Sequence, residues 1–398
     1  MKAGSDNKDM IFRAKGKAIG IDDFVVGKIT RDPYNQNNKL IYITSIAGLL
    51  PTGTLATITT DHQKTISQHI TPQVYGCNSL DHLEEGDVVM ADSNGVIRTL
   101  YRVNSYHNTI LSTERCNSNC LMCSQPPRDK DDIPALYEIY KRAIPLIPKD
   151  CMELTISGGE PTLMGELFFS LLELITIELP DTEIHILTNG RTFAWNHMAQ
   201  RLAKIQNHRI MLGIPLYSDY ADSHDYIVQA KDAFNQTILG LHNLARYGIR
   251  IEIRVVLHKA SIPRLAKLSA YIYKNLPFSE HITFMGLEFT GYTPFNIEKL
   301  WIDPVDYTTE LTKAVEYLSY RNMNVSIYNT QLCTIPEKLW AHCRKSISDW
   351  KNEYLPECQA CEKLNDCGGL FTWNLKKHSR AIAPIINQKI NETLPETC

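Results

Sequence analysis

The chain has 398 residues, of which 43% are hydrophobic, and a formal net charge of −3 at pH 7. This length predicts two or three domains, and the charge disfavours a broad basic surface for nucleic acid. No apolar run reaches the roughly 20 residues of a membrane span, and the first residues lack the apolar core of a signal peptide. We therefore expect a cytoplasmic protein whose eleven cysteines stay reduced and available to metal.

Residues 1–105 predict a small β-rich domain. Its apolar stretches are short and separated by turn-forming residues: Leu40–Ile46, Leu55–Ile58, Asp87–Met90 and Val96–Tyr101. The last two flank Asp92-Ser-Asn-Gly95, which favours a hairpin turn. No residue here demands chemistry, and Cys77 is expected to be a buried thiol. We expect the domain either to hold a partner or to cover the open edge of the domain that follows.

From about residue 109 to 328, strand and helix patterns alternate. The six strands are apolar runs rich in branched residues: Thr109–Thr113, Met152–Ile156, Glu183–Thr188, Arg209–Leu216, Ile249–Leu257 and His281–Phe289. The six helical patterns are Ala135–Ile147, Glu166–Leu179, Phe193–Ile205, Ala230–Tyr247, Ile262–Leu276 and Pro304–Tyr320. Continuous apolar strands separated by helices predict parallel βα units. Reactive residues in barrels of such units stand at the carboxyl ends of the strands.

A CxxxCxxC run, formed by Cys116, Cys120 and Cys123, follows the first of these strands. Soft thiolates select iron–sulfur clusters or zinc. A fully ligated cluster takes four cysteines, so three leave one iron free to bind another group. The alternatives are a zinc knuckle, for which no close fourth ligand follows, and buried free cysteines.

A second motif, Ser157-Gly-Gly-Glu-Pro161, directly follows the strand Met152–Ile156. Adjacent glycines let a backbone approach a ligand closely, and the Glu160 carboxylate can accept from an ammonium group. Alone, this run is also a plausible β-turn. Its place one βα unit after the cysteines favours a binding role.

Together these motifs resemble the signatures of the radical S-adenosylmethionine (SAM) superfamily. The resemblance implies an α/β fold with a partial (β/α)6 barrel and a [4Fe–4S] cluster held by Cys116, Cys120 and Cys123. It also implies a turn that holds the SAM amino group, formed by Gly158, Gly159, Glu160 and Pro161. Met122 takes a position that is usually aromatic in the superfamily and packs near the adenine.

Other polar residues stand at predicted strand ends. The third strand ends at Thr188-Asn189-Gly190, where the superfamily places a polar residue against the SAM ribose; a plain Asn-Gly turn is the alternative. Three more residues are candidates for the wall of a substrate cavity, although packing or surface exposure explains each equally simply: Tyr217, Glu288 and Tyr292.

Arg254 interrupts the buried fifth strand, where a basic residue needs an anionic partner. The SAM carboxylate is one such partner. An ion pair with Glu252 is expected to be less favourable, because residues i and i+2 share a face only at a distance. Many relatives carry a helix arginine after a His-Asp pair; here His224-Asp225 is present and Val228 occupies that place.

Residues 329–398 are rich in cysteine. The run Cys358-Gln-Ala-Cys361, followed by Cys367, resembles the start of the auxiliary-cluster (SPASM or twitch) domain of peptide-modifying radical SAM enzymes. Phe371 stands where the full pattern has another cysteine, so the resemblance implies one auxiliary [4Fe–4S] cluster. Its fourth ligand is expected to be Cys333; the rivals are Cys343 and Cys398. A structural zinc on four cysteines is the alternative.

Longer strings resemble the C-type radical SAM maturase of the His-Xaa-Ser repeat peptide system, at residues 100–102, 107–109, 120–127, 214–218 and 346–358. This resemblance implies a precursor peptide with His-Xaa-Ser repeats, a companion radical SAM maturase, and a one-electron reductant such as ferredoxin or flavodoxin. The sequence patterns divide the chain into three expected domains, at residues 1–105, 106–328 and 329–398. An auxiliary cluster that takes up an electron would make the peptide modification an oxidation, and charge and hydropathy predict no nucleic-acid or membrane partner.

Three other functions fit parts of the pattern. A small-molecule radical SAM enzyme, such as a cofactor-biosynthesis cyclase, also can carry an auxiliary cluster. A non-catalytic iron–sulfur electron carrier or scaffold is the second; three-cysteine ligation together with the Ser157–Pro161 motif argues against it. An inactive companion that only presents peptide would not need intact motifs.

Overall fold

The computed structural model describes residues 13–35, 37–45, 53–62, 72–345 and 353–386. The chain divides into two compact units, which are described separately. Unit 1 contains residues 1–117, 127–213 and 243–250, and unit 2 contains residues 118–126, 214–242 and 251–398. The domain boundaries expected after residues 105 and 328 remain predictions. Within the described ranges, no helix is both long and apolar enough to cross a bilayer.

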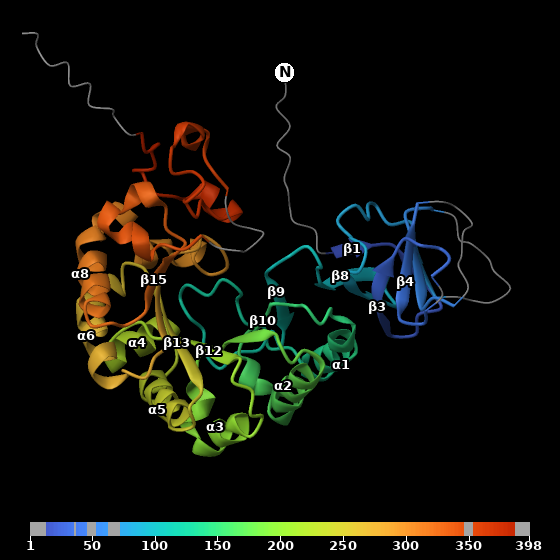
Figure 1. The fold of residues 1–398 in the computed structure, drawn as a ribbon, viewed down its shortest axis with the longest axis horizontal. Helices are drawn as coiled ribbons and strands as arrows, with labels where there is room; N and C mark the ends of the chain where they lie inside the picture. Colours follow the sequence, from blue (N-terminus) through green and yellow to red (C-terminus); the bar gives the residue numbers. More distant parts are fainter. Residues whose placement is uncertain (1–12, 36, 46–52, 63–71, 346–352, 387–398) are drawn as a thin grey trace, which may run out of the picture. The chain divides into compact units, whose positions relative to one another are not determined.

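The N-terminal part of unit 1 is an eight-stranded sheet, as the β-rich pattern predicts (Figure 1). Its strand order is β1-β8-β7-β3-β4-β5-β6-β2. The strands are β1 (Arg13–Lys15), β2 (Lys17–Ile19), β3 (Phe24–Thr30), β4 (Leu40–Thr44), β5 (Ala56–Thr59), β6 (Gln73–Tyr75), β7 (Val88–Asp92) and β8 (Val96–Tyr101). The expected hairpin joins β7 to β8, with Gly95 at φ +73°.

This sheet closes on itself through its first two strands. β1 and β2 stand at opposite ends of the strand order, yet only Gly16 separates them in the chain. A Cβ at Gly16 would lie 2.5 Å from Tyr75 O and 2.9 Å from Cys77 Sγ, so only glycine fits at this bend. A bent strand that pairs at both ends of a sheet is one way in which small barrels remove exposed edges. Cys77 is a buried thiol, as expected, and burial raises its pKa to about 11.

The second sheet has seven strands whose order follows the chain, and all of the described pairings are parallel. They are β9 (Asn108–Leu111), β10 (Glu153–Ser157), β11 (Glu183–Leu187), β12 (Ile210–Pro215), β13 (Arg250–Leu257), β14 (His281–Gly286) and β15 (Val325–Tyr328). The six predicted strands are present, and the seventh, β15, was not predicted. It is short and carries a serine, which leaves too few apolar residues for a clear pattern.

The described residues also form α-helices, which stand between the strands of the second sheet in the chain. They are α1 (Ile133–Ala143), α2 (Glu166–Glu178), α3 (Asn196–Ala203), α4 (Ala221–Val228), α5 (Ala233–Arg246), α6 (Leu265–Asn275), α7 (Ile297–Leu300) and α8 (Thr308–Ser319). α6 and α8 lie side by side in unit 2 (Figure 1). The sequence pattern missed α4, because its first turns are polar and only its last residues, Ile227 and Val228, are apolar and buried.

The α1 helix connects the two sheets of unit 1. The Arg142 guanidinium stacks over the Phe24 ring of β3 at 4.5 Å, and the Tyr140 hydroxyl accepts from the Leu111 N–H of β9 at 3.0 Å. The Asn108 side chain fixes the turn between β8 and β9 through Arg102, whose N–H donates to Asn108 Oδ1 at 2.8 Å. The N-terminal sheet therefore packs beside β9. This strand leads into the loop that contains Cys116, Cys120 and Cys123, which we call the cysteine loop.

Candidate functional site

The first part of the cysteine loop lies in unit 1, against the end of β10. The N–H of Gly159 donates to Thr113 O at 2.7 Å. A Cβ on Gly159 would lie 1.9 Å from Arg115 O, and a Cβ on Gly158, whose φ is +142°, would lie 2.4 Å from Thr113 O. Both glycines are therefore required by the backbone that leads into Cys116. The close approach that the sequence assigned to a ligand is made here by the cysteine loop itself.

The Glu160 carboxylate joins the ends of β10 and β11. It is fully buried, and Oε1 accepts from the hydroxyls of Thr162 and Thr188, both at 2.6 Å. Oε1 also accepts from the Thr162 N–H at 3.1 Å, and Oε2 accepts from the Asn189 N–H at 2.7 Å. Oε1 thus receives three donors and Oε2 one, so Oε2 keeps a lone pair that can accept from another donor. Glu160 holds Thr188 and Asn189 in place, and its predicted contact with the SAM amino group stays a prediction.

Asn117 links the end of β11 to the cysteine loop. Its side-chain oxygen accepts from Asn189 Nδ2 at 2.6 Å, and its carbonyl accepts from the Arg191 guanidinium. Gly190, at φ +76°, makes the turn between the two donors. No pattern in the sequence pointed to Asn117, because its role depends on a strand end that lies far along the chain.

The second part of the loop lies in unit 2 and is held by the C-terminus of α4. The Asn119 N–H donates to Val228 O and the Leu121 N–H donates to Ile227 O, both at 3.0 Å. The last carbonyls of a helix lack partners within it, and α4 ends at Gln229 with φ +53°. Val228, which stands where many relatives have an arginine, therefore contributes its carbonyl to this loop.

The segment after β14 also holds the loop. The Tyr292 N–H donates to Cys123 O at 2.9 Å, and Asn296 Nδ2 donates to Leu121 O at 2.9 Å. A Cβ on Gly291 would lie 2.1 Å from Cys123 O. The structure thus gives Tyr292 a backbone role, while the predicted place of Tyr292 and Glu288 on a substrate cavity wall stays a prediction.

Tyr217 lies in one apolar cluster with Leu121 and Met122, and the partly buried Cys120 packs against this cluster. Tyr217 is 7% exposed, and burial is the main cause that raises its pKa. Met122 is buried in this cluster, and its predicted contact with adenine stays a prediction.

Arg254 of β13 pairs with Glu252, although the sequence pattern favoured the SAM carboxylate over Glu252 as its partner. Arg254 Nη1 lies 2.9 Å from Glu252 Oε2, and Glu252 Oε1 lies 3.3 Å from His281 Nδ1. Residues i and i+2 of a strand are about 6.6 Å apart, which an extended arginine side chain spans easily. Because the Glu252 side chain is only 2% exposed, it needs this partner. A SAM carboxylate would have to use the remaining donors of Arg254.

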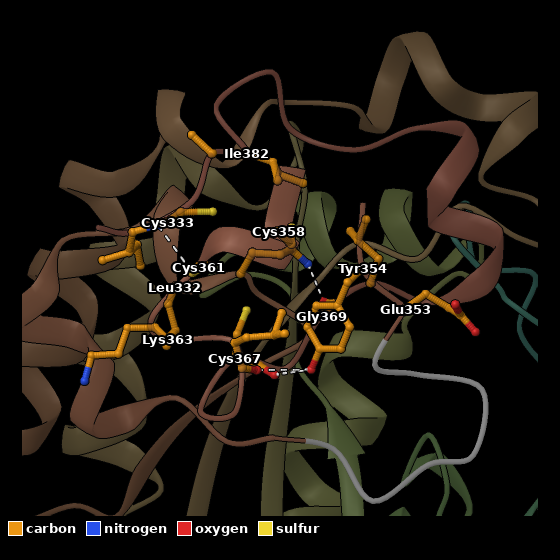
Figure 2. Close-up of a pocket in the computed structure, with 15 residues that line it drawn as sticks. Leu332, Cys333, Glu353, Tyr354, Cys358, Cys361, Lys363, Cys367, Gly369 and Ile382 are labelled. Atoms are coloured by element: carbon orange, nitrogen blue, oxygen red, sulfur yellow. Dashed lines mark hydrogen bonds between the residues drawn. The ribbon is translucent and has the colours of Figure 1, made fainter. Parts of the chain in front are cut away.

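A pocket in the C-terminal part of unit 2 is lined by Cys333, Cys358, Cys361 and Cys367 (Figure 2). The rest of its wall is mainly apolar and includes Leu332, Leu364 and Ile382. These are the four cysteines that the sequence grouped as auxiliary ligands.

Cys343, one of the two rival cysteines, is not among the residues that line this pocket. Cys343 Sγ donates to Leu339 O at 3.7 Å, and burial raises the pKa of this thiol to about 12. Cys398 and residues 346–352 of the longest family-like string lie outside the described residues.

Both sets of cysteines have the chemistry that an iron–sulfur cluster needs. All seven cysteines are of intermediate exposure, and none of them forms a disulfide. Among the described residues, no three His, Cys, Asp or Glu groups meet the spacing for a single metal ion. The fit therefore rests on the donor set, which is three thiols in the loop after β9 and four thiols around one pocket.

The region that carries the first set matches a family model. The model is described as the Radical SAM superfamily, and it matches residues 110–262. This part of the chain is a radical SAM domain. Its span includes the CxxxCxxC loop, the Ser157–Pro161 turn, Thr188, Asn189 and Arg254.

Solved structures with similar folds are distant from this chain. SuiB of Streptococcus suis bound to S-adenosylmethionine is 20% identical, with a TM-score of 0.44, over 56% of this chain and 50% of SuiB. The enzyme anSMEcpe with bound AdoMet is 19% identical, with a TM-score of 0.39, over 55% of this chain and 62% of anSMEcpe. The chain thus spans about half the length of SuiB. No curated protein matches the sequence.

A radical SAM domain implies a [4Fe–4S] cluster and SAM as its cofactors. The described geometry accounts for what holds the cysteine loop in each unit. The sequence anticipated the cysteines and the glycine turn, but not Asn117, Asn296 or the α4 carbonyls that fix the loop.

Proposed function

We propose that this protein is a radical SAM enzyme that oxidises a peptide. Cys116, Cys120 and Cys123 would hold the [4Fe–4S] cluster and leave one iron for the amino and carboxylate groups of SAM. When bound, the cluster would pass one electron to SAM. SAM would then cleave to methionine and a 5′-deoxyadenosyl radical, which would abstract a hydrogen atom from the substrate. A reductant such as ferredoxin or flavodoxin supplies the electron.

The residues of the domain would bind and orient SAM and the target carbon. Gly158, Gly159 and Pro161 shape the turn for the amino group, and Glu160 keeps Thr188 and Asn189 in place for the ribose. Met122 would pack near the adenine. Arg254, balanced by Glu252, would offer its free donors to the carboxylate. Such positioning decides which hydrogen is removed.

The four-cysteine pocket is the observation that carries the oxidative part of the proposal. Cys358, Cys361 and Cys367 share it with Cys333, which supports Cys333 as the fourth ligand of an auxiliary [4Fe–4S] cluster. A peptide that loses a hydrogen atom, and then an electron and a proton, is oxidised by two electrons. The electron needs an acceptor near the substrate, and an auxiliary cluster is suited to that role.

The peptide is proposed from the sequence strings that resemble the His-Xaa-Ser maturases. We propose a precursor with His-Xaa-Ser repeats as substrate and a second radical SAM maturase as companion, in the cytoplasm.

The experiment is anaerobic turnover of the reconstituted protein with dithionite, SAM and a synthetic His-Xaa-Ser repeat peptide. The proposal expects 5′-deoxyadenosine and a peptide lighter by two hydrogen atoms. The matched control is the Cys116→Ala variant, which should give neither. 5′-Deoxyadenosine without any change in the peptide would keep the radical SAM activity and reject this substrate.

A further inference from the structure

A C-terminal segment, residues 379–385, lies against the four-cysteine pocket; we call it the strap. Three of its residues, Ile382, Ala383 and Ile385, line the pocket together with the cysteines, and Ile382 is seen at its rim in Figure 2. The strap carries no cysteine and was not singled out by any pattern in the sequence.

The backbone of the strap supplies a donor to one of the thiols. The Ile385 N–H donates to Cys361 Sγ at 3.3 Å. The strap is also tied to the loop after Cys361, since the Glu362 N–H donates to Ile385 O at 2.9 Å. Hydrogen bonds to sulfur are one of the means by which a protein tunes an iron–sulfur cluster.

The other end of the strap is held by one buried carboxylate, Asp303, which precedes α8 and is 6% exposed. Its Oδ1 accepts from Ser379 Oγ at 2.5 Å, and its Oδ2 accepts from the Arg380 N–H at 2.9 Å. The Arg380 guanidinium lies 3.2 Å from Asp303 and also pairs with the exposed Asp306 at 2.5 Å. Burial raises the pKa of Asp303, but the hydrogen bonds from Ser379 and Arg380 outweigh it and leave the pKa below its usual value.

We propose that Asp303 is a positioning residue for the auxiliary cluster: it holds the strap so that the Ile385 backbone N–H faces the sulfur of Cys361. This inference rests on the proposed function, because it needs a cluster in the four-cysteine pocket. It goes beyond that function by assigning a main-chain donor to the cluster and the latch that places this donor.

Two properties of the latch support this role. First, its hydrogen bonds run to the backbone and hydroxyl of the strap, so they fix the path of the chain and not only one side chain. Second, Asp303 is buried, whereas the Asp306 side chain is 47% exposed. Charge-assisted hydrogen bonds to a buried carboxylate contribute more to the stability of a fold than an exposed ion pair does. Asp306 therefore offers a matched control at the same arginine.

The test is made in the full chain with Cys116, Cys120 and Cys123 changed to alanine, so that any remaining cluster is the auxiliary one. Asp303→Asn is compared with Asp306→Asn and with Ser379→Ala. The latter removes no charge, but it removes the bond to Asp303 and the bond that Ser379 Oγ accepts from the Ala381 N–H. For each, we would measure iron release to a ferrous chelator and the EPR spectrum of the dithionite-reduced cluster. Thermal unfolding shows whether the variants are folded.

We expect Asp303→Asn to release iron about tenfold faster, the factor that corresponds to loss of one charge-assisted hydrogen bond, and to change the EPR spectrum. Ser379→Ala should change both in the same direction but less, and Asp306→Asn should leave both near the parent values. Equal release and identical spectra in a folded Asp303→Asn protein would overturn the strap proposal alone. A parent that binds no iron and sulfide would overturn both the strap proposal and the auxiliary cluster, so the two failures are distinguishable.

Discussion

Replacing Glu160 by glutamine tests whether this residue acts by positioning the ends of β10 and β11. The carboxylate accepts four hydrogen bonds in a fully buried site. In the best orientation, the glutamine oxygen keeps the three bonds of Oε1. Its NH₂ group then faces the Asn189 N–H, so one bond to a charged group is lost and two buried donors oppose each other. These losses correspond to about 2–3 kcal/mol in the free energy of unfolding.

The assay is denaturant unfolding of the apo protein, followed by circular dichroism. Glu166→Gln is the matched control, because Glu166 makes an exposed ion pair with Arg201 at 3.3 Å. Such pairs contribute about 0–1 kcal/mol. A Glu160→Gln variant as stable as Glu166→Gln would refute the positioning role. Reduced SAM binding without a loss of stability would point instead to direct contact between the carboxylate and the ligand.

Three further predictions follow from buried contacts. Gly159→Ala should abolish loading of the first cluster, because its Cβ would lie 1.9 Å from a carbonyl oxygen. Gly368→Ala is the control and should load normally, because the nearest atom to its Cβ is 3.7 Å away. Iron and sulfide are measured in each variant after the auxiliary cysteines have been removed. His258 has a pKa lowered to about 3 by burial, so the folded state favours its neutral form and loses stability as pH falls below the ordinary value of 6.5. The free energy of unfolding should fall by about 2 kcal/mol between pH 7 and 5, and this loss should be absent in a His258→Gln variant. Denaturant unfolding at each pH measures it. Equal pH slopes in the parent protein and the variant would contradict the prediction. Arg254→Gln should lower the free energy of unfolding by about 3 kcal/mol, because the buried Glu252 carboxylate loses its arginine partner. Adding Glu252→Gln should recover much of this loss in a double-mutant cycle. Independent, additive losses would show that the two residues are not coupled.

The sequence predicted the elements whose signal is local. Each of the six apolar runs from Thr109–Thr113 to His281–Phe289 became a parallel strand, because a strand covered on both faces must be apolar along its length. The β15 strand and α4 were missed for the converse reason. Each is short and contains polar residues, so it depends on neighbours that are distant in the sequence.

The site shows the same division. Motif spacing singled out the CxxxCxxC loop and the glycine turn, and the resemblance to an auxiliary-cluster domain grouped the four cysteines that share a pocket. The pairing of Arg254 with Glu252 was misjudged, because strand spacing was considered without the reach of a long side chain. Asn117, the α4 carbonyls and the Asp303 latch could not be predicted, since each joins segments that only the fold brings together.

The most direct test of the account is iron and sulfide per chain in the Cys116/Cys120/Cys123→Ala variant, reconstituted without oxygen. The account predicts that about four of each remain, as one cubane, and that further replacement of Cys333 by alanine lowers both. If neither iron nor sulfide remains, the C-terminal pocket is a zinc or thiol site. An oxidative peptide modification through an auxiliary cluster would then be contradicted, and a redox-neutral reaction of the radical SAM domain would take its place.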